Sequence, residues 1–256
     1  MSLTMCCLAS GSKGNCCFVS DGETNLLIDL GITAQRAEKC LAALGVDPDG
    51  VSVVVTHSHS DHIGGLKVFC KRHPSVRVHC QRESAGEIIS RAGVIPTVDA
   101  RAAEIGGLTV NAVPVPHDVP CFGYVVRNHT ASVAVVTDVG TVTDGTLDAL
   151  GGCGIVMIEA NHEPDLLRAN RRYSPMLKAR IASYRGHLSN PDCAAACVGL
   201  AGRGVRNFIL AHLSEDNNDP TLAVSEVCAC LNKSGYFGVN VTAAEQDAMT
   251  GVYEVC

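Results

Sequence analysis

The chain has 256 residues, of which 46% are hydrophobic and 18% are charged, and its formal net charge is −6. This composition excludes a disordered tail, and the negative charge excludes a globally basic nucleic-acid coat. Trp is absent and aromatic residues make up 4% of the chain, which argues against an aromatic platform that stacks on bases. No linker rich in Gly, Pro or Ser interrupts the sequence, so we expect one domain over residues 1–256.

No segment has the pattern of a leader or a membrane span. The first ten residues lack the Lys or Arg that begins a signal peptide, and no run approaches the roughly 20 apolar residues that cross a bilayer. The 14 cysteines form no C-x-x-C pattern, so we interpret most of them as reduced, buried thiols. The expected location is therefore the cytoplasm, without a membrane partner.

Strand-like and helix-like runs alternate along the chain. Strands are expected at 3–9, 16–20, 25–29, 51–56, 76–80, 108–115, 121–127, 132–137, 155–159 and 207–211. Helices are expected at 33–44, 61–73, 81–92, 175–184, 191–200 and 222–231. The early strands are joined by short turns and the later ones by helices. This order favours an α/β (α+β) sandwich of two mixed sheets with helices outside over a doubly wound parallel sheet.

The segment HSHSDH, residues 57–62, follows the expected strand at 51–56. His57 and His59 are two residues apart, so an extended chain directs both imidazoles to one face. Asp61 and His62 begin the next helix and can turn back toward the same point. Three imidazoles and one carboxylate in such a short segment are ligands suited to zinc, manganese or iron.

HSHSDH resembles the H-x-H-x-D-H signature of the metallo-β-lactamase superfamily. Four single residues that follow strands complete the order of that family: Asp29, His117, Asp138 and His212. The resemblance implies a four-layer αββα sandwich in which two mixed sheets pack face to face with helices outside. Segments 10–16, 159–162, 185–190 and 211–217 resemble the YycJ/WalJ branch, a set of bacterial DNA exonucleases.

The resemblance also implies a role for each of these residues. His57, His59 and His117 would hold one divalent ion, Asp61, His62 and His212 a second, and Asp138 would bridge the two. Two ions of zinc, manganese or iron would trap a hydroxide that attacks a phosphodiester, and Asp61 would also serve as general base. Asp29 would orient the motif loop through hydrogen bonds. A turn or helix-capping role is the alternative for each single residue.

Further side chains are candidates for contact with the substrate or the leaving group. His187, in a Gly-His-Leu-Ser segment that resembles one in ribonuclease Z relatives, would serve the leaving group, or else be a buried histidine tied to the backbone. Lys13 and Asn15 lie in a glycine-containing loop that is either an anion-binding nest or a plain turn. His162 and Arg185 are the remaining candidate substrate contacts.

A basic stretch precedes His187, with no acidic residue inside it. Its members are Arg168, Arg171, Arg172, Lys178, Arg180 and Arg185. In an acidic chain this stretch is a candidate phosphate track for a nucleic acid, which we expect to be DNA; the alternative is a solvated helix face.

The expected function is that of a dinuclear metal-dependent DNA exonuclease, with 5′-to-3′ polarity implied by the resemblance. A small-molecule or cyclic-nucleotide phosphodiesterase is the main alternative, and a thioester or lactam hydrolase or a metal-binding scaffold is less favoured. The 73 residues between Asp138 and His212 are too few for the inserted domain of the β-CASP nucleases. The sequence leaves the metal identity open.

Overall fold

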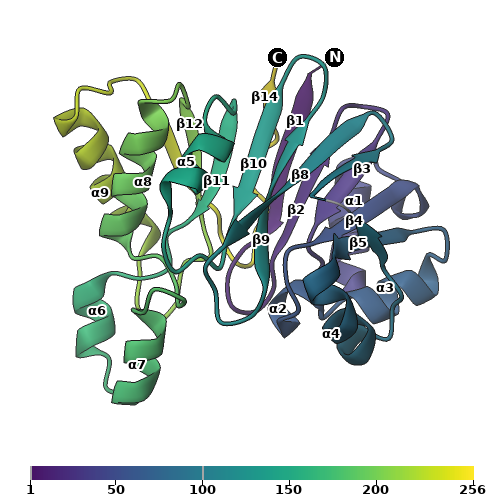
Figure 1. Ribbon diagram of the computed structural model, residues 1–256, viewed down its shortest axis with the longest axis horizontal. Coiled ribbons are helices and arrows are strands. Elements are labelled where there is room, and N and C mark those ends of the chain that lie inside the picture. The colour runs from purple at the N-terminus through teal and green to yellow at the C-terminus, as the bar shows by residue number, and fades with distance from the viewer. Residues whose placement is uncertain (1, 100) are drawn as a thin grey trace. The chain divides into compact units, whose positions relative to one another are not determined.

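The computed structural model describes residues 2–99 and 101–256 (Figure 1). It contains two seven-stranded sheets. The chain divides into two compact units, which we describe separately. Unit 1 comprises Met1–Ala112, Val126–Ser132 and Glu245–Cys256, and unit 2 comprises Val113–Val125 and Val133–Ala244. The expectation of one domain over residues 1–256 stays a prediction.

The first sheet has the order β14-β1-β2-β3-β4-β5-β6. Its strands are β1 (Leu3–Ala9), β2 (Cys16–Ser20), β3 (Asn25–Ile28), β4 (Val51–Val55), β5 (Arg77–Gln81), β6 (Thr97–Asp99) and β14 (Tyr253–Val255). Pairing is antiparallel from β14 to β3 and parallel from β3 to β6. The change of direction follows from the connections, because tight turns join antiparallel strands whereas parallel strands need a longer crossover.

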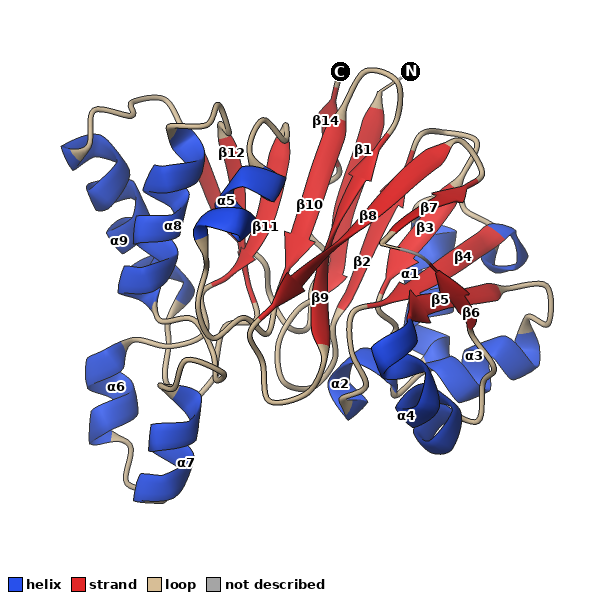
Figure 2. Cartoon of the chain, viewed as in Figure 1, coloured by secondary structure: helices blue, strands red, loops and turns tan. Residues whose placement is uncertain are grey.

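Helices α1, α3 and α4 supply crossovers and lie beside the parallel strands of this sheet (Figure 2). The helical segments of unit 1 are α1 (Ala34–Ala43), the 3₁₀ turn η1 (Pro48–Gly50), α2 (Ser60–Ile63), α3 (Leu66–Arg72) and α4 (Arg82–Ala92). As expected, Thr33 caps α1, with its side chain accepting a hydrogen bond from the Arg36 backbone N–H, and Gly93 ends α4 in the left-handed conformation. Buried aliphatic residues, Phe69 and several cysteines form the core of the unit.

The single helix expected over residues 61–73 is wrong, because the structure has two short helices there. They are separated at Gly64 and Gly65, where a Cβ on Gly65 would lie 2.0 Å from the backbone oxygen of Ile32. The Gly65 N–H also donates to the Leu30 carbonyl (2.9 Å). The turn at residues 30–32 therefore approaches the chain too closely for a side chain, and this approach breaks the helix.

The second sheet has the order β13-β12-β11-β10-β9-β8-β7. Its strands are β7 (Ala102–Ile105), β8 (Leu108–Val115), β9 (Cys121–Arg127), β10 (Ser132–Val136), β11 (Ile155–Glu159), β12 (Asn207–Ala211) and β13 (Asn240–Ala243). Strands β10 to β13 pair in parallel, and β7 pairs with β8 in the antiparallel direction. Consequently the carboxyl ends of β10, β11 and β12 lie at one edge of the sheet.

Five helices belong to unit 2. They are α5 (Asp144–Leu150), α6 (Pro164–Ala169), α7 (Pro175–Ile181), α8 (Asn190–Ala201) and α9 (Pro220–Lys233). The sequence indicated α7, α8 and α9 but not α5 or α6, because these two are too short to show a helical period. Figure 1 shows α6 and α7 as neighbours, and the Lys178 ammonium on α7 donates to the Arg168 carbonyl on α6 (2.6 Å).

None of the helices in the described ranges combines the length and the apolar character that crossing a membrane requires. All 14 cysteines fall within the described residues, and all are free thiols. Ten of them are buried, where they act as small apolar side chains. Burial raises the pKa of the Cys7 thiol to about 12, with a smaller contribution from neighbouring Cys6. These thiols are therefore protonated and poorly reactive.

Candidate metal centre

The histidine motif of unit 1 begins in the loop after β4 and continues into α2, and backbone hydrogen bonds hold this segment. The Asn15 N–H donates to the Asp61 carbonyl (2.7 Å), and the Leu30 N–H donates to the His62 carbonyl (2.9 Å). A Cβ on Gly31 would lie 1.6 Å from that same Asp61 oxygen, so only glycine permits the approach. Backbone contacts therefore fix the position of the motif.

Asp29 orients the motif through both of its carboxylate oxygens. Oδ2 accepts hydrogen bonds from His62 Nδ1 (2.7 Å) and Thr56 Oγ1 (2.8 Å), and Oδ1 accepts one from the Thr56 backbone N–H (2.8 Å). Asp29 is buried and has a φ of 63°, a left-handed conformation that is uncommon for residues other than glycine. These hydrogen bonds fix the orientation of the His62 ring, and the role of Asp29 at a metal site stays a prediction.

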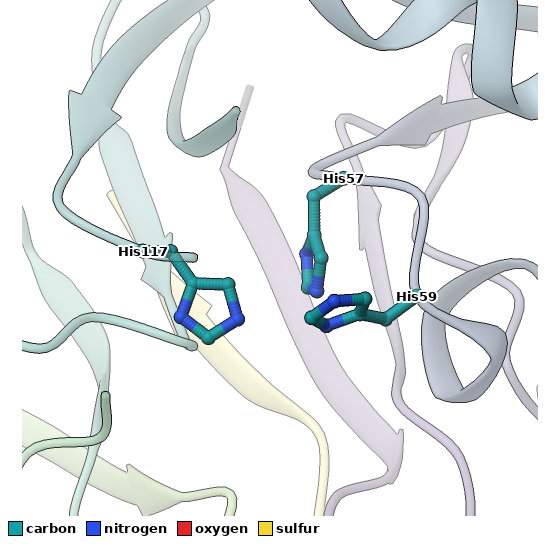
Figure 3. Close-up of side chains that lie close together, drawn as sticks. All are labelled: His57, His59 and His117. Atoms are coloured by element: carbon teal, nitrogen blue, oxygen red, sulfur yellow. The ribbon is translucent and has the colours of Figure 1, made fainter. Parts of the chain in front are cut away.

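The four expected ligands of unit 1 lie together. The ring centroids of His57 and His62 are 4.1 Å apart, and those of His57 and His59 are 4.7 Å apart in an edge-to-face arrangement (Figure 3). The Oδ2 atom of Asp61 lies 3.5 Å from His62 Nε2. Asn15 is buried, and its side-chain amide contacts the same Nε2 (3.0 Å), so Asn15 braces a candidate ligand. Lys13 is exposed.

In unit 2 the candidate ligands follow the carboxyl ends of neighbouring parallel strands. Asp138 follows β10, Glu159 ends β11 and His212 follows β12. Asp138, Glu159, His187 and His212 each offer a ligand atom, and these atoms lie within 4.8 Å of one another. Asp138 and His212 have φ values of 56° and 54°, so the chain leaves both strands through a strained conformation.

Glu159 is the central residue of this cluster, and the sequence did not reveal its role. Its Oε1 accepts from Nδ1 of both His187 (2.9 Å) and His212 (2.7 Å). Its Oε2 accepts from the backbone N–H groups of Val139 (2.8 Å) and Leu188 (3.2 Å). Burial alone would raise the pKa of Glu159, but the two imidazoles outweigh burial and bring it to about 2. The carboxylate of Glu159 is therefore ionised. The sequence feature that could have indicated its role is an acidic residue at the end of an apolar strand.

His117, drawn with His57 and His59 in Figure 3, follows β8. Its Nδ1 donates to the Gly186 carbonyl (3.2 Å), while Nε2 lies 3.2 Å from an Asp118 carboxylate oxygen and 3.9 Å from Asp138 Oδ1. Burial lowers the pKa of His117, only partly opposed by the charge of Asp138. The Arg185 Nε–H donates to the His117 carbonyl (2.6 Å), so Arg185 braces the loop that carries this imidazole.

The donors of both units fit divalent metal ions. Metal-binding histidines commonly donate the N–H of one ring nitrogen to a carboxylate or carbonyl, which leaves the lone pair of the other nitrogen for the metal. The Nδ1 atoms bonded in this way are those of His62, His117 and His212. In His62 the Asn15 amide contacts Nε2, so this contact would have to open for His62 to bind a metal. The Nε2 atoms of these three histidines, together with the carboxylates of Asp61 and Asp138, form a mixed nitrogen and oxygen set suited to zinc, manganese or iron.

His187 lies in the loop before α8, and His162 lies in the loop after β11. Burial opposes protonation of His187, but the neighbouring Glu159 carboxylate outweighs it and raises the pKa of this imidazole. His162 is buried, and its burial lowers its pKa. The protonated form is therefore favoured for His187 and the neutral form for His162.

The basic stretch is less positive in the structure than in the sequence. Carboxylates from outside the stretch pair with three of its members: Arg168 with Asp165, Arg172 with Asp216 and Arg180 with Asp118. Arg171 is exposed and is in none of these pairs. Half of the charge expected from the sequence is thus compensated locally.

Comparisons with known proteins show the family and the fold of the chain. The chain matches the family described as Beta-lactamase superfamily domain over residues 24–213. It is 34% identical to Exodeoxyribonuclease YycJ of Bacillus anthracis, across 93% of this chain and 92% of the relative. It is 31% identical to Exodeoxyribonuclease WalJ of Streptococcus pneumoniae, across 84% and 83%. The metallo-beta-lactamase fold protein YhfI from Bacillus subtilis superposes with a TM-score of 0.74 at 15% identity over both whole chains, which confirms the expected fold class.

Proposed function

The chain belongs to the β-lactamase superfamily, and we propose that it is a two-metal phosphodiesterase that removes nucleotides from DNA ends, in the 5′-to-3′ direction. The observation that carries the proposal is the set of paired carboxylate anchors, Asp29 and Glu159, each holding Nδ1 of a candidate metal-binding histidine. Two relatives named exodeoxyribonucleases, similar over more than four fifths of both chains, support the choice of DNA.

Seven side chains would hold the two cations. His57, His59 and His117 would hold the first cation, Asp61, His62 and His212 would hold the second, and Asp138 would be shared by the two. A metal ion of this kind needs about four donors.

The remaining chemistry belongs to side chains of this protein. When bound, the cations supply an activated water and stabilise charge on the phosphodiester oxygens. Asp61 accepts the hydrogen bond that orients the attacking water. His187 has its Nδ1 held by Glu159, so Nε2 is the ring atom that contacts the departing oxygen. Because Glu159 also holds His212, one carboxylate sets the spacing between the leaving-group contact and a metal ligand.

The phosphate track is proposed in a narrower form than the sequence indicated. Arg171 offers an exposed charge outside the local ion pairs, and Lys178 keeps N–H donors beyond its bond to the Arg168 carbonyl.

The free thiols fit a reducing compartment. We accordingly propose action on DNA in the cytoplasm.

The test uses the full chain loaded with Mn²⁺ or Zn²⁺. Substrates are linear DNA labelled at its 5′ or 3′ end, the same sequence as a closed circle, an RNA of equal length, a cyclic nucleotide and a glutathione thioester. Release of mononucleotides from linear DNA, with the circle intact, is the expected result, and the two labels report polarity. Thioester turnover without phosphodiester turnover would overturn the proposal, and cleavage of only the cyclic nucleotide would replace it with the main alternative.

A further inference from the structure

A cavity of about 730 Å³ lies within unit 2, bordered by α5, α6, α7 and α8. One part of its wall is the imidazole of His187, whose Nδ1 lies 3.7 Å from Asp138 Oδ1. The volume falls in the range of about 300–1,000 Å³ that is typical of pockets for small molecules. The chemistry proposed above uses His187 but leaves the rest of this cavity unassigned.

The wall combines an apolar surface with a few polar groups, which is the pattern of a ligand pocket. Its apolar side chains include Val142, Leu147, Leu167, Leu188, Ala195 and Ala196. Its polar side chains include His162, Ser183, Tyr184 and Asp192. A flat, partly apolar ring with polar edges would satisfy both kinds of surface.

His162 supplies a second observation that indicates a ligand. Only 2% of the His162 surface is exposed to solvent, and the residue lines the cavity. Its Nδ1 is buried and has no hydrogen-bond partner among the described residues. Buried polar atoms are normally paired, so an unpaired one at the wall of a cavity calls for an explanation. Because His162 lines the cavity, a rotation of its imidazole would bring this atom to the polar edge of a bound ligand.

Charge at the wall favours an anionic group on the ligand. Arg168 and Lys178 both line the cavity, and the Lys178 ammonium uses one donor on the Arg168 carbonyl. Asp165 compensates the Arg168 guanidinium, which leaves Lys178 as the main cation of the wall. The cavity therefore offers an apolar surface, hydrogen-bonding side chains and a cation beside His187.

We propose that this cavity receives the terminal nucleotide of the DNA strand, with its base against the apolar wall and its terminal phosphate near Lys178. The inference rests on the proposed function, because it takes the phosphodiester to be cleaved beside His187. A pocket that holds a single nucleotide would explain why a strand end, rather than an internal site, is the substrate.

The main test fills the cavity from an exposed helix position. Ala195 is exposed on α8 and lines the cavity, so Ala195→Phe reduces the space without cutting into the core. Ala229→Phe, at an exposed position of α9 that does not line the cavity, is the matched control. The probes are deoxyadenosine 5′-monophosphate, whose binding is measured by calorimetry, and end-labelled linear DNA.

We expect Ala195→Phe to weaken binding of the mononucleotide at least tenfold and to raise KM for DNA ends by a similar factor, with metal content and Tm as in Ala229→Phe. His162→Phe, which keeps the ring and removes its nitrogens, should weaken mononucleotide binding several-fold. Equal mononucleotide binding and KM in Ala195→Phe and the control would overturn the inference, as would absence of mononucleotide binding to the unmodified protein.

The two proposals fail separately. If the unmodified protein leaves linear DNA intact yet binds the mononucleotide, and Ala195→Phe abolishes that binding, the cavity assignment stands and the exonuclease proposal falls. If DNA is degraded equally by both Phe variants, the exonuclease proposal stands and the cavity assignment falls.

Discussion

Replacing Glu159 by Gln should destabilise the protein and empty part of the metal centre. The carboxylate accepts four hydrogen bonds, two at each oxygen. An amide has one accepting oxygen, so its NH₂ group faces either the two backbone N–H groups or the two imidazole Nδ1 atoms. Facing the backbone, it leaves two buried donors without an acceptor, at about 1–3 kcal/mol each, or about 2–6 kcal/mol in total. Facing the imidazoles, it moves their protons to Nε2, which removes the lone pair that His212 would offer to a metal.

The assay is thermal and urea unfolding of the metal-free protein, followed by elemental analysis after reloading. A loss of this size lowers Tm by at least about 4 °C in a chain of this length. Glu23→Gln, in an exposed turn, removes the same charge without removing buried acceptors and should stay within about 0.5 kcal/mol of the parent. If Glu159→Gln unfolds like Glu23→Gln and binds as much metal as the parent, the anchoring role of Glu159 is refuted.

Three further changes test other parts of the centre. Asp138→Ala should lose metal and activity together, and a variant that keeps two ions per chain by elemental analysis would contradict the bridging role. His187→Ala should keep its metal content but lose most of its turnover on poor leaving groups, measured with a series of aryl phosphodiesters; an unchanged dependence on leaving group would remove His187 from catalysis. Arg171→Glu should weaken DNA binding and flatten its salt dependence by about one to two phosphate contacts, so an unaltered slope would exclude this residue from the track.

The elements that were predictable from the sequence are those whose signals are local. The capping Thr33, the left-handed Gly93 and the apolar runs of β4 and β11 need no information from distant residues. The break between α2 and α3 is different, since it arises where the chain at Ile32 approaches Gly65, a contact that no local pattern encodes.

The site shows the same division. The spacing within HSHSDH and the family order of single residues pointed to the candidate ligands. Glu159 was recognisable only as an acid at the end of a strand, because its two histidine partners lie 28 and 53 residues further along the chain. The pairing of Arg172 with Asp216 could not be predicted either, because the two residues are far apart in the sequence. Residue types predicted the chemistry, whereas tertiary contacts decided which side chains hold it in place.

The left-handed backbone at Asp29, Asp138 and His212 has an evolutionary consequence. Each such residue costs about 1–3 kcal/mol where glycine would cost little. A lineage that no longer needed the enzyme could exchange these side chains for glycine and gain a sturdier scaffold. These three residues therefore lower the stability of the chain, and selection for catalytic turnover rather than for stability would keep them.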